Sequence, residues 1–322
     1  MAQHLRRRQV VVAALAATAP LARASAQAWP DRPIRLLAGV PAGSPTDIAA
    51  RLLADRLGAT RGWRLVVDNR PTANGMLAMD TVRRAAPDGY TLIFTASSTL
   101  TVLPHLSRNA DWKPADFTPV IHIGATPIAI TVAADSPLRS LADLIAAAKA
   151  KPDTIKAGLL PLTMSHFAQL MLDRAAGIAL RPIPYTAQSQ LLQSVLSRDV
   201  DVIFNGAGGV VAAVEGGQMR ALAVTGEPIP ALPGTPSAAA DLPGFDASSW
   251  FGLFGPARMD AETVTLLNEA INAVLREPDM RAKLERTGAV VTGGPPGRLA
   301  AAAENDFARF GELVAREHLS AD

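Results

Sequence analysis

Short apolar segments rich in β-branched residues alternate with longer Ala- and Leu-rich segments along most of the chain. A strand–helix–strand order of this kind favours a parallel sheet covered by helices. In the first third, this pattern predicts strands at 34–40, 65–67 and 91–95, with helices at 46–57 (ending at Gly58) and 75–84. The chain is therefore expected to have an α/β fold.

A second series of the same kind follows. Ser140 and Asp143 have the spacing of a capping box, which predicts that a helix begins at Leu141 and runs to Ala150. Further strands are predicted at 155–158, 182–185, 200–204 and 221–225, with helices between them, and the chain is predicted to end in helices at about 261–276, 278–286 and 298–316. Two series favour two lobes with mainly parallel sheets.

Two apolar runs, 120–132 and 249–254, are predicted as extended strands that cross between the lobes. Two crossings would take the chain into a second lobe and back. We therefore expect lobe 1 to comprise residues 27–125 plus about 232–322, and lobe 2 about 126–231.

Residues 1–26 have the pattern of a signal peptide. Four arginines and no acidic residue accompany a short apolar run, and Ala24-Ser25-Ala26 is a small-residue cleavage pattern. Arg7-Arg8-Gln9-Val10-Val11 also fits a twin-arginine signal, which leaves the export route open. The predicted location is the periplasm.

The chain has 31 basic and 29 acidic residues. Without the four arginines of residues 1–26 it would have 27 basic and 29 acidic residues, a net charge of −2, which removes the electrostatic basis for nucleic-acid binding. There is no cysteine, so thiolate metal sites and cysteine nucleophiles are excluded. We expect no metal and no cofactor.

In α/β sheets, ligands bind outside the carboxyl ends of the strands. Ser44 can be the N-cap of a helix there, with Asp47 as its capping-box partner. A helix N-terminus facing a cleft suits a carboxylate, although the same pattern describes a helix that is simply well capped. Two other loops offer hydroxyl and imidazole groups: Ser97-Ser98, and Thr163 with Ser165 and His166.

Enzyme signatures are absent from the sequence. There is no G-x-S-x-G, H-E-x-x-H, Walker or G-x-G-x-x-G motif, and the histidines have no metal-ligand spacing. A Ser–His pair formed by folding is left open by the sequence, as is a periplasmic hydrolase that uses Ser44, Ser97 or Ser165. The expected protein is a binding protein, not an enzyme.

From about Trp29 onward the chain resembles the Bug family, the substrate-binding proteins of tripartite tricarboxylate transporters. The matching segments are 29–34 (WPDRPI), 43–47 (GSPTD), 67–71 (VDNRP), 85–91 (AAPDGYT), 183–185 (IPY), 219–225 (MRALAVT), 242–245 (LPGF) and 249–254 (SWFGLF). The resemblance implies a type II periplasmic-binding fold that holds a carboxylate between two lobes and delivers it to membrane permease subunits.

The resemblance also implies the ligand-binding positions. By position they are Ala42, Gly43, Ser44, Thr46, Asp47, Ser97, Ser98, Leu162, Thr163, Ser165, His166, Tyr185, Ala187 and Asn205.

Three departures from the family pattern favour a more apolar ligand. Pro45 stands where glycine is usual and lacks a backbone donor. Leu160-Pro161-Leu162 replaces small and polar residues, and Asn205 replaces aspartate. We expect an aromatic or branched monocarboxylate and a monomeric protein. A sensor that reports its ligand to a membrane kinase is the alternative function.

Overall fold

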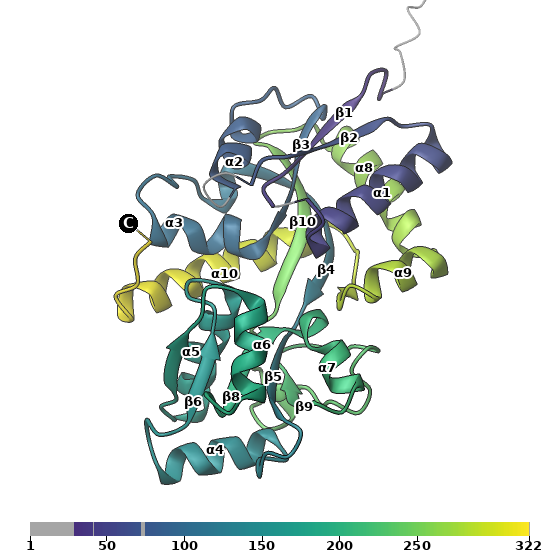
Figure 1. Ribbon diagram of the computed structural model, residues 1–322. Coiled ribbons are helices and arrows are strands. Elements are labelled where there is room, and N and C mark those ends of the chain that lie inside the picture. The colour runs from purple at the N-terminus through teal and green to yellow at the C-terminus, as the bar shows by residue number, and fades with distance from the viewer. Residues whose placement is uncertain (1–28, 41, 72–74, 322) are drawn as a thin grey trace, which may run out of the picture.

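The computed structural model describes residues 29–40, 42–71 and 75–321 and contains two sheets, each flanked by helices (Figure 1). We call the part around the strands β11-β4-β10-β3-β1-β2 lobe 1, and the part around β7-β6-β8-β5-β9 lobe 2. Both parts have the predicted α/β character. The predicted signal peptide, residues 1–26, lies outside the described residues.

Lobe 1 takes its elements from both halves of the chain. They are β1 (Ile34–Ala38), α1 (Pro45–Arg61), β2 (Leu65–Asn69), α2 (Met76–Arg83), β3 (Thr91–Ala96), the π-helical turn η2 (Ser98–Val102), α3 (Leu103–Leu106), β4 (Phe117–Thr126), β10 (Ser249–Pro256), α8 (Ala261–Leu275), α9 (Pro278–Glu285), β11 (Val290–Val291) and α10 (Pro296–Arg316). No helix in the described ranges is both long enough and apolar enough to cross a membrane.

Lobe 2 is formed by one continuous stretch of the chain. Its elements are β5 (Ile128–Ala133), α4 (Leu141–Ala150), β6 (Lys156–Leu159), α5 (Met164–Ala176), β7 (Arg181–Pro184), α6 (Gln188–Leu196), β8 (Val202–Gly206), the 3₁₀ turn η4 (Ala207–Gly209), α7 (Val211–Glu215) and β9 (Met219–Val224). The expected boundaries at about 125/126 and 231/232 remain a proposal.

The strands that cross between the lobes make both sheets mixed. β1 pairs in parallel with β2 and β3, and β6 pairs in parallel with β7 and β8. β10 instead runs antiparallel to β3 and β4, and β5 runs antiparallel to β8 and β9. Each sheet therefore has a parallel part, with its strand ends facing one edge, and an antiparallel part at the crossing.

Two predicted boundaries are wrong for identifiable reasons. Helix α1 continues through Gly58 and ends at Gly62, which takes the left-handed conformation (φ +70°) and donates to the Gly58 carbonyl at 3.0 Å. The single strand predicted at 120–132 is divided into β4 and β5 by Pro127, which has no N–H for a sheet.

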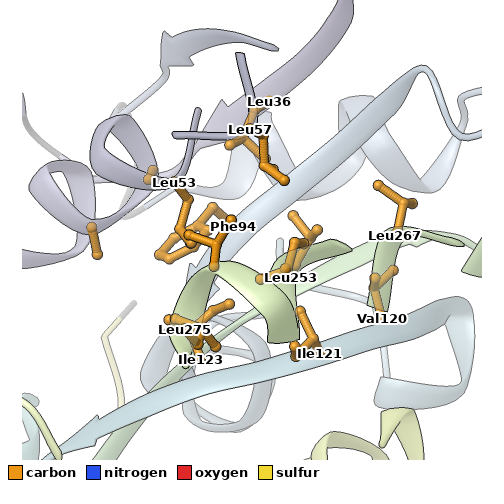
Figure 2. Packing of buried hydrophobic residues seen from close by; sticks show 14 of the residues in the cluster. Leu36, Leu53, Leu57, Phe94, Val120, Ile121, Ile123, Leu253, Leu267 and Leu275 are labelled. Atoms are coloured by element: carbon orange, nitrogen blue, oxygen red, sulfur yellow. The ribbon is translucent and has the colours of Figure 1, made fainter. Parts of the chain in front are cut away.

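The main core of lobe 1 lies between its sheet and helices α1 and α8. Figure 2 shows Leu36 and Phe94 from the sheet packing toward Leu53 and Leu57 of α1. These four side chains are at most 3% exposed. Their burial fixes α1 on the sheet, and with it the loop that enters α1 from β1.

Helix α10 packs against both lobes. Figure 1 shows it running across the boundary, between α3 and α5. Phe310 of α10 belongs to one buried cluster with Leu106 of α3 and Phe167 of α5, and the Phe310 and Phe167 rings lie 5.3 Å apart. The lobes are thus joined by shared apolar packing as well as by the crossing strands.

The far end of α5 contains a half-buried carboxyl group, one oxygen of which has no hydrogen-bond partner among the described residues. Asp173 Oδ2 accepts hydrogen bonds from Gln169 Nε2 (2.9 Å) and from the Leu180 amide (3.3 Å). Asp173 Oδ1 is buried and has no hydrogen-bond partner in the described part of the chain. Burial raises the pKa of Asp173 from its ordinary value of 3.8 to about 6.

We expect Asp173→Asn to remove a pH dependence of stability. Because the folded-state pKa is the higher one, the folded protein binds the extra proton between about pH 4 and pH 6, so stability falls as pH rises through that window. In the wild type this group should lower the free energy of unfolding by about 1–3 kcal/mol between pH 4 and pH 7. Urea unfolding at several pH values measures this change in the free energy of unfolding. The exposed Asp241→Asn is the control, and an unchanged slope in Asp173→Asn would contradict the prediction.

Candidate functional site

A cavity of about 480 Å³ lies where the two lobes face each other. Lobe 1 contributes the loops after β1, β2 and β3, and lobe 2 contributes the loop between β6 and α5. The lining residues are Gly39, Val40, Pro71, Ser98, Thr99, Val102, Leu103, Leu106, Pro161, Leu162, Thr163, Met164 and Ala321. This is the carboxyl edge of parallel strands, where ligands of α/β sheets bind.

The lining combines an apolar surface with a few hydroxyl groups. Ser98, Thr99 and Thr163 carry the hydroxyls, and none of the lining side chains is charged. Most of the other side chains are aliphatic. A ligand there would meet hydrogen-bond donors and apolar surface without an ion pair.

Helix α5 begins at this cavity. Its N-cap Thr163 accepts a hydrogen bond from the Ser165 amide at 3.2 Å and donates to the Leu160 carbonyl at 2.7 Å. The remaining first-turn amides of this 13-residue helix have no partner within the helix. Their positive end favours an anion at the cavity.

Ser165 and His166, which are predicted ligand-binding residues on the α5 side, make hydrogen bonds within the protein. The Ser165 hydroxyl donates to the Phe204 carbonyl, which ties α5 to β8. His166 Nδ1 accepts a 3.4 Å bond from the Leu162 amide, and burial lowers the pKa of His166 below its ordinary value. A neutral imidazole is the form that can accept this bond.

On the lobe 1 side, Asp47 holds the loop that enters α1. The buried carboxylate accepts hydrogen bonds from the Gly43 amide (2.8 Å), Arg51 Nε (3.0 Å) and Asn69 Nδ2 (2.8 Å). Burial by itself would raise the pKa of Asp47, but these bonds outweigh it and hold the pKa below its ordinary value. Ser44 is the predicted N-cap, whereas Asp47 returns to Gly43 and not to Ser44 as a capping box would require. Asp47 therefore supports the loop and has little capacity left for a ligand.

The other predicted positions differ in their access to the cavity. Ser98, Leu162 and Thr163 line it. Ala42, Gly43, Ser44 and Thr46 lie in the adjoining loop and first turn of α1, and Ser97 is buried with its hydroxyl 3.2 Å from that of Ser249. Tyr185 and Ala187 lie between β7 and α6 and do not line the cavity.

Asn205 has an unsatisfied donor at the end of β8. The residue is 4% exposed, and its Nδ2 has no hydrogen-bond partner among the described residues. A buried amide donor without a partner costs free energy, so this group calls for an acceptor from a ligand or water. Asn205 does not line the cavity. It lies at the carboxyl end of β8 in lobe 2, the lobe that contributes the loop between β6 and α5 to the cavity.

Several lining residues had no individual signal in the sequence. Val102, Leu103 and Leu106 come from η2 and α3, an apolar run that follows β3. Ala321 reaches the cavity because its amide donates to the Leu106 carbonyl at 3.0 Å. Only the packing of α10 could reveal that contact.

The three serines considered as nucleophiles are not paired with histidine. Ser44 accepts from the Asp47 amide, Ser97 meets Ser249, and Ser165 donates to Phe204. In the described ranges, no group of three or more acidic or histidine side chains is placed to hold a metal ion. The polar groups that line the cavity are uncharged and can form hydrogen bonds with a ligand.

We expect Asp47→Asn to loosen the loop between β1 and α1. The amide would replace one acceptor oxygen by a donor and leave Gly43 or Asn69 unpaired, which should lower the free energy of unfolding by about 1–3 kcal/mol. Hydrogen exchange of the peptide that contains Gly43 should become faster. Asp55→Asn, an exposed change on the same helix, should have neither effect, and unchanged exchange in Asp47→Asn would refute the role of this carboxylate.

Comparison with known proteins gives the family. Residues 49–319 match the model of the tripartite tricarboxylate transporter family receptor. The protein BugT of Bordetella pertussis is 30% identical over 94% of this chain and 95% of its own length.

Solved structures agree with this match. A TctC solute-binding protein from Polaromonas has a TM-score of 0.81 at 26% identity, covering 89% of this chain and 99% of its own. A protein of R. palustris solved with adipate has a TM-score of 0.72 at 30% identity, covering 91% and 99%. The Polaromonas protein is a solute-binding protein, and the two-lobed α/β architecture of this chain matches its structure. The chain belongs to the tripartite tricarboxylate transporter receptor family, as its resemblance to Bug proteins predicted.

Proposed function

We propose that this protein captures a small carboxylate between its lobes in the periplasm and delivers it to the membrane subunits of a tripartite tricarboxylate transporter. The observation that carries the proposal is the cavity walled by both lobes, with the N-terminus of α5 opening onto it. Residues 1–26 would direct export. The adipate bound by the R. palustris relative supports a carboxylate ligand.

The carboxylate would be held by dipoles in place of ion pairs. The first-turn amides of α5 and the hydroxyl of Ser98 would supply donors at the cavity, whereas the Thr163 hydroxyl already donates to the Leu160 carbonyl. The unpaired Nδ2 of Asn205 supplies another donor for a ligand that extends toward β8. Oriented donors of this kind can bind an anion without a buried cation, and desolvating them costs less than desolvating an arginine.

The rest of the ligand would be apolar. Val102, Leu103, Leu106 and Leu162 face the same cavity, and no lining side chain is charged. A citrate-like ligand would have to place two further carboxylates against this surface. An aromatic or branched monocarboxylate fits the lining better.

Closure would depend on a direct contact between lobes. A Cβ atom on Gly208 of η4 would lie 2.4 Å from the Thr287 carbonyl oxygen, and one on Gly288 would lie 2.5 Å from the Gly208 Cα. The two backbones therefore meet only because neither glycine has a side chain. Val290 of lobe 1 adds apolar packing against the same region of lobe 2. A ligand that binds both lobes would stabilise the state in which they meet.

A thermal-shift screen of the chain from Gln27 onward tests the proposed ligand class. At 100 times its Kd, a ligand that binds only the folded state adds about 2.7 kcal/mol of stability. Benzoate or 4-methylpentanoate should raise the unfolding midpoint more than citrate does. A rise with citrate alone would refute the apolar ligand, and no binding of any carboxylate, with none released on denaturation, would refute the proposed function.

We expect Gly208→Ala to favour the open form. The added methyl group cannot coexist with Thr287 at the present separation, so the closed state should lose about 1.4 kcal/mol, and ligand affinity should fall about tenfold. Small-angle scattering with and without ligand measures closure. Gly297→Ala is a matched control because a Cβ there has open space. Normal closure in Gly208→Ala would show that the glycine contact has no role.

A further inference from the structure

Leu162 has a backbone conformation that leucine rarely adopts. Its φ is +57°, in the left-handed region that favours glycine. The other described non-glycine residues with positive φ are Asp153, Arg198, Arg258 and His318, all polar and exposed. Leu162 is apolar and half-buried, and it lines the cavity between the lobes.

The local sequence explains why the backbone at position 162 has a positive φ, but it does not explain why the residue there is leucine. The Thr163 amide donates to the Leu160 carbonyl at 3.4 Å, which closes a four-residue turn with Pro161 in its second position. Proline in the second position and positive φ in the third are the pattern of a type II turn, whose third position favours glycine or asparagine. A leucine there costs free energy that either of those residues would save.

The surrounding contacts hold this strained conformation. The Leu162 amide donates to His166 Nδ1, and the Thr163 side chain donates to the Leu160 carbonyl. The Leu162 side chain packs against the buried cluster that contains Val102 and Leu106. The leucine therefore completes an apolar wall made by both lobes.

We propose that Leu162 selects ligands with an apolar tail. Its side chain forms the wall that the tail contacts, and the strained backbone is maintained because that wall is needed. This inference rests on the proposed function, since it assumes that the ligand is a carboxylate bound in this cavity. The chemical class selected is a monocarboxylate whose end remote from the carboxylate is hydrocarbon. A hydroxyl that packed against the wall formed by Leu103, Leu106 and Leu162 would lose its hydrogen bonds to water without replacement there.

Titration calorimetry with two ligands of equal length tests the proposal. Hexanoate and 6-hydroxyhexanoate differ only in the terminal hydroxyl. The wild type should prefer hexanoate, and Leu162→Ala should reduce that preference about tenfold, mainly by weakening hexanoate. Leu160→Ala is the matched control: Leu160 belongs to the same turn but packs against a different cluster and does not line the cavity, so the preference should not change.

A third variant separates strain from packing. Leu162→Gly and Leu162→Ala both remove the wall, but only glycine relaxes the left-handed backbone. The unfolding midpoint of Leu162→Gly should therefore exceed that of Leu162→Ala by roughly 2–4 °C, with the same loss of ligand preference in both. Equal loss of preference in these two variants assigns the selectivity to the side chain.

The outcomes distinguish this inference from the proposed function. If the wild type binds carboxylates but Leu162→Ala keeps the preference for hexanoate within twofold, the role of Leu162 is overturned and the receptor function stands. If the wild type binds hydroxylated acids in preference to hexanoate, the role of Leu162 is likewise overturned. If the wild type binds no carboxylate, both are overturned.

Discussion

The antiparallel pairing of β4 with β10 joins eight pairs of residues, from Phe117 and Pro256 at one end to Thr126 and Ser249 at the other. Both strands belong to the sheet of lobe 1, and each continues toward lobe 2. The chain can therefore leave lobe 1 after Thr126 and return at Ser249 without interrupting the lobe 1 sheet. Pro127 then ends the pairing on one side, because it has no N–H to donate. The parallel strands remain free to present their carboxyl ends to the cleft.

Helix α10 limits how the lobes can move about this pair of strands. His105 Nε2 lies 2.8 Å from the Phe307 carbonyl, and a side chain on Gly311 would collide with the His105 ring. This close packing fixes α10 to lobe 1, while Phe310 carries the same helix onto Phe167 of lobe 2. A hinge motion must therefore slide or tilt one apolar contact as well as bend the strands. The glycine contact between Gly208 and Gly288 lies at a separate point of the boundary between the lobes.

The cavity proposed as the binding site has polar groups but no charged side chain in its lining. Its anion preference would come from the N-terminal amides of α5 and the hydroxyl of Ser98, while the unpaired amide of Asn205 lies outside the lining. Asp47 is the charged residue nearest in sequence to the loop after β1. Its carboxylate already accepts hydrogen bonds from Gly43, Arg51 and Asn69. The backbone is strained at Leu162, where leucine stands in place of the glycine or asparagine that the turn would favour. Such departures from local preference are typical of functional positions.

The sequence by itself determined the α/β class, the two lobes and the apolar runs that form the crossing strands, because these follow from hydrophobic period, capping residues and turn chemistry that are local along the chain. Ser98, Leu162 and Thr163, three positions that the family resemblance implied, line the cavity, and their role in ligand binding stays a prediction. Local pattern failed at Gly58, where the helix continued, and at Asp47, whose carboxylate turned to Gly43 and Asn69. Only the tertiary structure decided that Leu106 and Ala321 join the cavity, that Gly208 meets Gly288, and that Leu162 has a left-handed backbone. These features depend on distances between segments far apart in sequence, or on a backbone angle fixed by surrounding contacts, and residue spacing encodes neither.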